Sequence, residues 1–432
     1  MSLNRLALQK FNIPSDLIEK SELVETELCE KFGEIDSIRQ FNQLKVLSAF
    51  QAEGVSESDL GISRGYGYND FGRDKLERVY ARVFGAEKAL VRISMLSGTT
   101  AINTVLFGLL RPGDELLAIS GKPYDTLDSV IGFNEKERNI NEFSALQHGS
   151  LRDFCIDYDQ VDLLDNSEPD FELIKKKIKS NTRMVHIQRS RGYSSRKTLS
   201  IATIKKMIDT VKKINNKIIV FVDNCYGEFT EILEPCEVGA DIIAGSLIKN
   251  PGGGLAPSGA YIAGKSNLVD LCAERYSAPG LGAEVGASLG FNQVLYQGFF
   301  LAPNVVGENL KGLCFCSRML EEFGYKTSPS YSELRSDIVQ LIQFDNKEDM
   351  IFFVEAIQAA APIDSFVKPI PAYMPGYTSD VIMAAGAFVQ GASIELSADG
   401  PVIPPYIVYM QGGLVYANIK VAVLLALKKM KY

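Results

Sequence analysis

The 432-residue sequence is poor in the residues that build metal centres and disulfide frameworks. It has only two histidines, His148 and His186, so a histidine-built metal site is not expected. Its seven cysteines are odd in number and irregular in spacing, which matches neither a zinc-binding pattern nor a set of paired disulfides. We therefore expect no metal, and we interpret the cysteines as buried free thiols of a protein from a reducing compartment.

Long apolar runs and an excess of basic residues are also missing. The longest apolar stretches, such as Val421–Leu427, fall well short of the about 20 residues that a transmembrane helix needs, and the N-terminal segment has no signal-peptide pattern. The formal net charge is −8. Because nucleic-acid binding favours a basic face, we expect no nucleic-acid partner. Because the apolar runs are short, we expect no membrane partner. The chain is predicted to be a soluble cytoplasmic protein.

The hydrophobic pattern divides the chain into three parts. Residues 1–60 are mostly helical in pattern, and residues 61–300 begin with a glycine- and tyrosine-rich loop and then alternate apolar β runs with helical segments. This alternation predicts an α/β fold with a mostly parallel sheet covered by helices. Residues 301–432 predict a smaller C-terminal α+β domain, in which Pro303 precedes a long helix, Val305–Phe323. The strands expected in the middle part are Ala89–Ser94, Glu115–Ser120, Met184–Gln188, Ile218–Asp223, Asp241–Ala244 and Ala260–Ala263.

A polar turn follows the first of these strands. Ser97, Gly98 and Thr99 open the next predicted helix. Backbone N–H groups at a helix N-terminus bind phosphate, glycine permits its close approach, and the two hydroxyls add donors. Taken alone, the same turn is more typical of an ordinary serine N-cap.

Asp223 and Lys249 each follow an apolar strand. Asp223 ends the strand Ile218–Asp223, at the edge where open α/β sheets bind ligands, and a pyridinium nitrogen would supply the cation that a carboxylate needs there. Lys249 lies 26 residues further on, next to Leu247 and Ile248. Apolar surroundings disfavour the ammonium form, which makes the amine nucleophilic, as Schiff-base chemistry requires. Ser246 lies three residues before Lys249 and offers a further phosphate donor.

As a set, these segments resemble the fold-type-I enzymes that use pyridoxal 5′-phosphate (PLP). The resemblance is clearest in V-D-N-C-Y-G-E-F (222–229) and G-S-L-I-K-N-P-G-G-G (245–254), and it extends to R-G-Y-G-Y-N-D-F-G-R (64–73) and Q-G-G-L-V-Y-A-N-I-K (411–420). More closely, the chain is similar to cystathionine β-lyase/methionine γ-lyase-like proteins, the aluminium-resistance family. The resemblance implies a PLP-dependent transferase-like fold, fold type I.

The resemblance also implies roles for the residues at these positions. Lys249 would hold PLP as the internal aldimine and shuttle the proton at the substrate Cα, Asp223 would pair with the pyridine nitrogen, and Tyr124 would stack on the ring. The cofactor phosphate would be bound by Ser97, Gly98, Thr99 and Ser246. In related lyases a tyrosine-containing segment of a neighbouring subunit reaches the phosphate, and the candidates here are Tyr66, Tyr68 and Arg73. A homodimer or homotetramer with active sites at the subunit interface is therefore expected.

The substrate carboxylate needs a cationic partner that the C-terminal part does not offer in the usual context. Beyond residue 300 the arginines are Arg318 and Arg335, and neither is in such a context. Because bidentate carboxylate binding favours arginine over lysine, we nominate Arg191 first and Arg196 second, in the loop 188–196. The alternative is that both are surface groups.

The activity that the resemblance implies is a PLP-dependent carbon–sulfur lyase. Its substrate would be a small sulfur amino acid of the cystathionine or methionine type, cleaved by β- or γ-elimination. Transamination or aldol-type cleavage is the alternative within PLP chemistry. A PLP-binding metal-stress protein with little lyase activity is the alternative outside it.

Overall fold

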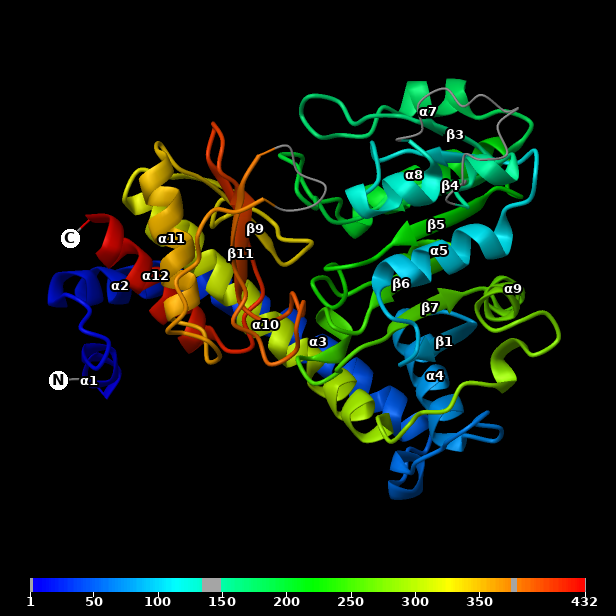
Figure 1. Ribbon diagram of the computed structural model, residues 1–432, viewed down its shortest axis with the longest axis horizontal. Helices are drawn as coiled ribbons and strands as arrows, with labels where there is room; N and C mark the ends of the chain where they lie inside the picture. The colour runs from blue at the N-terminus through cyan, green and yellow to red at the C-terminus, as the bar shows by residue number, and fades with distance from the viewer. Residues whose placement is uncertain (1–2, 134–148, 374–378, 432) are drawn as a thin grey trace. The chain divides into compact units, whose positions relative to one another are not determined.

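The computed structural model describes residues 3–133, 149–373 and 379–431 (Figure 1). Contacts within the chain group it into two compact units. The α/β unit consists of Lys45–Leu247 and Ser258–Tyr296, and the C-terminal unit consists of Met1–Leu44, Ile248–Pro257 and Gln297–Tyr432. The division of the chain into residues 1–60, 61–300 and 301–432 stays a prediction.

The α/β unit is built on a seven-stranded sheet with the order β1-β7-β6-β5-β4-β2-β3. The strands β2 to β6 run parallel to one another, while β7 pairs antiparallel with both β1 and β6. All six expected strands are present, so the mostly parallel sheet is confirmed. The strand bounds are β1 Lys88–Arg92, β2 Glu115–Ala118, β3 Asp157–Gln160, β4 Thr182–Gln188, β5 Ile219–Asp223, β6 Ile242–Ser246 and β7 Ala260–Gly264.

Helices α5 and α9 bury one face of this sheet. Met184, Phe221 and Ile242 belong to one hydrophobic cluster with Val105 of α5 and Cys272 of α9. Side chains alternate between the two faces of a strand, so the last residues Gln188 of β4, Asp223 of β5 and Ser246 of β6 point to this same face. The helices of the unit are α4 Phe71–Phe84, α5 Gly98–Leu109, α6 Asp128–Ile131, α7 Phe171–Lys177, α8 Ile201–Ile214 and α9 Ser266–Tyr276.

The C-terminal unit contains a five-stranded antiparallel sheet with the order β10-β11-β12-β9-β8, which confirms the expected α+β character. Its strands are β8 Lys326–Ser328, β9 Val339–Gln343, β10 Val381–Ala384, β11 Ser397–Pro401 and β12 Ile407–Gln411. Its helices are α1 Leu3–Gln9, α2 Ser15–Glu27, α11 Lys347–Ala359 and α12 Tyr416–Lys431, and α3 Cys29–Ala52 and α10 Asn292–Glu322 have residues in both units. None of the helices in the described ranges has both the length and the apolar character needed to cross a membrane.

The long helix α10 corrects one expectation. Pro303 was expected to precede the helix, but it lies inside α10, which begins at Asn292. A proline removes one backbone donor from the helix interior. Here Phe299, Ala302 and Val306 surround it and are fully buried, and burial of this apolar face outweighs the lost hydrogen bond.

Candidate functional site

The start of α5 forms a close-packed cradle at the carboxyl edge of the sheet. Ser97 is the N-cap, and its Oγ accepts a hydrogen bond from the N–H of Thr100 at 3.2 Å. A Cβ placed on Gly98 would lie 3.1 Å from the Cys225 Sγ and 3.4 Å from the Ser246 Cβ. The first turn of an α-helix has N–H groups without partners inside the helix, so this cradle suits a phosphate group.

Asp223 lies at the centre of the same edge. It ends β5 between its register partners Gln188 of β4 and Ala244 of β6, and it is only 5% exposed. Its Oδ1 accepts the backbone N–H of Cys225 at 3.1 Å. A carboxylate buried to this degree is stabilised by a cationic partner, and a protonated ring nitrogen would be one.

Lys249 follows the end of β6 closely in the chain. Ser246 is the last residue of β6 and is buried, and Lys249 begins the turn Asn250–Gly252, where its carbonyl accepts the N–H of Gly252 at 3.2 Å. Lys249 belongs to the C-terminal unit, whereas Asp223 belongs to the α/β unit. The joint use of Lys249 and Asp223 for one cofactor stays a prediction.

Tyr124 is anchored by a residue that the sequence did not single out. Its backbone N–H donates to the Gln188 Oε1 at 2.7 Å, and the Gln188 Nε2 donates to the Ser190 carbonyl at 3.1 Å. The Tyr124 and Tyr193 rings are 5.7 Å apart. The sequence does hold a signal for Gln188: it is the last residue of the expected strand Met184–Gln188, just as Asp223 is the last residue of the expected strand Ile218–Asp223.

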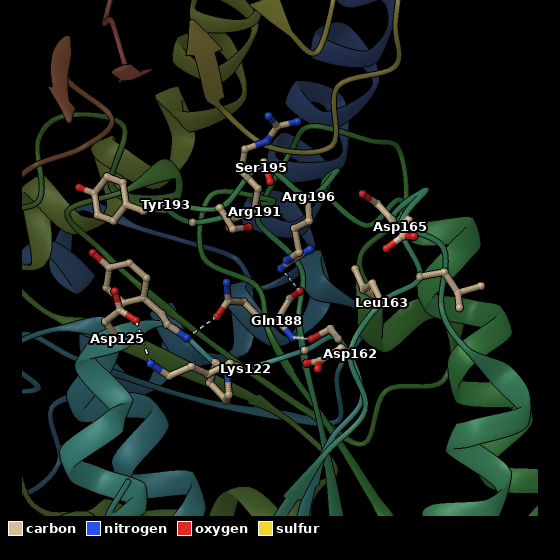
Figure 2. Close-up of a pocket in the computed structure, with 18 residues that line it drawn as sticks. Lys122, Asp125, Asp162, Leu163, Asp165, Gln188, Arg191, Tyr193, Ser195 and Arg196 are labelled. Carbon is tan, nitrogen blue, oxygen red and sulfur yellow. Dashed lines mark hydrogen bonds and ion pairs between the residues drawn. The ribbon is translucent and has the colours of Figure 1, made fainter. Parts of the chain in front are cut away.

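Arg191 and Arg196 both line a cavity next to Tyr124, but their surroundings differ. Arg191 is 2% exposed. The guanidinium of Arg196 donates to the carbonyls of Gln188 at 2.9 Å, of Lys197 at 3.1 Å and of Ser190. Arg196 therefore holds the loop 188–196 in shape, and Figure 2 shows its side chain directed toward the Gln188 segment.

The cavity has a volume of about 500 Å³ and draws its walls from four segments of the α/β unit (Figure 2). These segments are the turn after β2, the turn after β3, the end of β4 and the loop that follows β4. A cavity of this size is in the range that holds a small ligand. The residues that line it are Ser120, Gly121, Lys122, Pro123, Tyr124, Asp125, Asp162, Leu163, Leu164, Asp165, Ser167, Gln188, Arg191, Gly192, Tyr193, Ser194, Ser195 and Arg196.

Tyr66 and Tyr68 lie in the glycine-rich loop and are exposed, whereas Arg73 lies in the first turn of α4 and is buried. Tyr66 is 72% exposed and Tyr68 is 56% exposed. Arg73 is buried and donates to the carbonyls of Gly67 at 3.0 Å and Gly286 at 2.9 Å. The two tyrosines are thus available to a partner, while Arg73 fixes the loop from inside.

A buried polar layer supports the segment that follows Asp223. Arg189 is fully buried and donates to Asn224 at 2.8 Å and to Glu231 at 3.1 Å. It also pairs with Glu234 at 3.5 Å, and burial raises the pKa of the Glu234 carboxyl. The backbone N–H of Arg189 donates to the Asp223 carbonyl at 3.1 Å. Sequence reasoning did not identify Arg189, because its partners come from a loop more than 30 residues away.

His186 lies on β4 two residues before Gln188 and is fully enclosed. Its ring is 5.3 Å from the Phe221 ring, and burial lowers its pKa to about 4, so the ring is neutral near pH 7. Neither ring nitrogen has a hydrogen-bond partner among the described residues. Within the same part of the chain, no group of three His, Cys, Asp or Glu residues could hold a metal ion, and His148 lies outside it.

Comparison with known proteins identifies the family to which the chain belongs. The family model for methionine γ-lyase matches residues 17–431. A crystal structure from Listeria monocytogenes, described as a candidate cystathionine β-lyase involved in aluminium resistance, is 56% identical, with a TM-score of 0.91 over 95% of this chain and 98% of that one. A structure from Clostridium novyi NT, described as a carbon–sulfur lyase involved in aluminium resistance, is 47% identical, with a TM-score of 0.93 over 100% of both chains.

A more distant likeness concerns the fold alone. The PLP-dependent protein YhfS from Escherichia coli is 15% identical, and it matches 90% of this chain and 95% of its own length with a TM-score of 0.58. The resemblance found in the sequence is thus confirmed at the level of family and fold. The chain belongs to the methionine γ-lyase family, and its architecture is that of the fold-type-I PLP-dependent enzymes.

Proposed function

We propose that this member of a carbon–sulfur lyase family cleaves a sulfur amino acid with the help of PLP. The observation that carries the proposal is the meeting of the start of α5, Asp223 and Ser246 at one edge of the sheet. A phosphate cradle and a buried carboxylate at the same edge suit the two ends of a pyridoxal phosphate ring.

The residues present fit this cofactor. Any side chain on Gly98 would fill the space between Cys225 and Ser246, so the cradle is open only because residue 98 is glycine. The amides of Gly98 and Thr99 and the hydroxyls of Ser97 and Ser246 would bind the phosphate. Asp223 would hold the ring nitrogen, Tyr124 would cover the ring, and Lys249 would attach the cofactor covalently. When bound, PLP supplies an electron sink for negative charge at the substrate Cα.

The chain's own groups would then bind the substrate and move the proton. The Lys249 amine would take the proton from the substrate Cα, since an amine freed in largely apolar surroundings is an effective base. Arg191 would bind the substrate carboxylate in two-point geometry. Elimination of the sulfur group from Cβ or Cγ, followed by hydrolysis with one water molecule, would give a thiol, a keto acid and ammonia.

The exposed pair Tyr66 and Tyr68 would complete the site of a second copy of the chain. Their rings are 5.7 Å apart and both side chains are largely exposed, so they are free to reach a partner's phosphate. Under this proposal the active unit is at least a dimer. Arg73 would act indirectly, by holding this loop.

The test is an absorbance spectrum of the purified protein with PLP, followed by sulfur amino acids with detection of thiol and keto acid. We expect a visible band that is lost in Lys249→Ala and kept in the control Lys347→Ala, which changes an exposed lysine at the start of α11. Release of thiol and keto acid without an added acceptor supports the lyase. Turnover that requires a keto-acid acceptor indicates a transaminase instead, and the lack of any band with added PLP refutes the cofactor assignment.

A further inference from the structure

Cys225 lies between the two groups that would hold the ends of the cofactor. A Cβ added to Gly98 would be 3.1 Å from the Cys225 Sγ, and the backbone N–H of Cys225 donates to the Asp223 Oδ1 at 3.1 Å. Cys225 therefore borders the phosphate cradle on one side and the buried carboxylate on the other. All three residues belong to the α/β unit.

The Asp223 carboxylate points independently to a ligand next to this thiol. Asp223 is 5% exposed, and the bond from Cys225 is the one hydrogen bond that its side chain accepts from the described residues. A carboxylate has acceptor sites on both oxygens, and leaving them unused in a buried position costs free energy. A cationic ligand that binds the second oxygen would lie beside the residue that binds the first.

The other shielded cysteines are better protected from reagents than Cys225. Cys272, Cys314 and Cys316 are fully enclosed, whereas Cys225 keeps 6% of its surface exposed. Burial raises the pKa of the Cys272 thiol and of the Cys316 thiol to about 12, and it also raises the pKa of the partly buried Cys236 thiol. Since the thiolate is the reactive form, these three thiols are expected to react slowly.

We propose that Cys225 is a modification site that the cofactor controls: a small thiol reagent modifies it in the cofactor-free protein, and bound PLP covers it. With methyl methanethiosulfonate, the Cys225 sulfur attacks the methylthio sulfur and the S–S bond of the reagent breaks. A new S–S bond forms on Cys225, methanesulfinate leaves with the electron pair, and the thiol proton goes to water. The proposal rests on the proposed function, because it uses the PLP site assigned there.

A methylthio group on Cys225 would in turn keep the cofactor out. A single added Cβ on Gly98 would already be in tight contact with the Cys225 Sγ at 3.1 Å. A further sulfur atom and carbon atom on this thiol would therefore occupy space that the cofactor needs, because protein interiors are close-packed. Modification of Cys225 and binding of PLP should thus exclude each other.

The first test follows modification at each cysteine by peptide mass spectrometry, in the cofactor-free protein and with PLP at about ten times its Kd. PLP should slow modification of Cys225 by about tenfold or more, because only the cofactor-free fraction reacts, and should leave the rate at the exposed Cys155 unchanged. An equal rate at Cys225 in protein whose absorbance band shows bound PLP overturns the inference. A lack of modification at Cys225 in the cofactor-free protein overturns it too. If no PLP binds, the proposed function itself fails.

The second test titrates the modified protein with PLP and has a matched control. The Kd for PLP should rise by about tenfold or more, and dithiothreitol should restore the original value because it removes the methylthio group. In Cys225→Ser, the same reagent still modifies the exposed Cys29 and Cys155 and should leave the Kd of that variant unchanged. A Kd that stays the same after full modification of Cys225 in the unaltered protein overturns the inference.

Discussion

Gly98→Ala tests the phosphate cradle with one methyl group. The new Cβ would lie 3.1 Å from the Cys225 Sγ and 3.4 Å from the Ser246 Cβ, so both neighbours would have to shift by a few tenths of an ångström. Overpacking of this kind costs about 1–3 kcal/mol, and the shift falls on the atoms proposed to hold the cofactor. If half of that cost falls on binding, the Kd for PLP should rise by about two- to tenfold.

The assay is a titration of the cofactor-free protein with PLP, followed by absorbance, with thermal unfolding measured in parallel. The control is Gly33→Ala in α3, where an added Cβ meets nothing within 4 Å. That change should leave the Kd unchanged and stabilise the helix by up to about 1 kcal/mol. If the unaltered protein binds PLP and Gly98→Ala has the same Kd, the assignment of this turn as the phosphate cradle is refuted.

Three further changes probe the residues around this edge. Arg189→Met leaves the Glu234 carboxylate buried without its cation and should lower the free energy of unfolding in urea by about 3–5 kcal/mol; a loss below about 1 kcal/mol would contradict this role. Because burial holds the pKa of His186 at about 4 in the folded protein, below its usual value near 6.5, its stabilising contribution is full above pH 6.5 and is lost as the pH falls toward 4. His186→Phe should flatten that part of the stability curve, and an unaltered curve would argue against a neutral buried ring. Arg191→Ala should raise KM for every amino-acid substrate by about tenfold or more, and an unchanged KM would eliminate Arg191 as the carboxylate partner.

Much of the α/β unit could be predicted because its signals are local. Helix α8 spans Ile201–Ile214. Its apolar residues repeat at helical spacing over this range, and the range begins directly after the Ser200 cap. The apolar strand that ends at Asp223 also has the expected bounds to within one residue. By contrast, β3 was not expected, because Asp157–Gln160 is polar and forms a strand only through its pairing with β2 at the sheet edge.

By itself, the sequence determined the family, the parallel sheet and the positions of Asp223 and of the turn at Gly98, since these follow from periodicity and from short motifs. Tertiary structure alone decided which residues, distant in the chain, become partners: Gln188 holds Tyr124 across 64 residues, and Arg189 reaches Asn224 across 35. It also turned Arg73 inward and buried Arg191. Such contacts depend on which strands become neighbours, and no local pattern of residue types encodes that pairing.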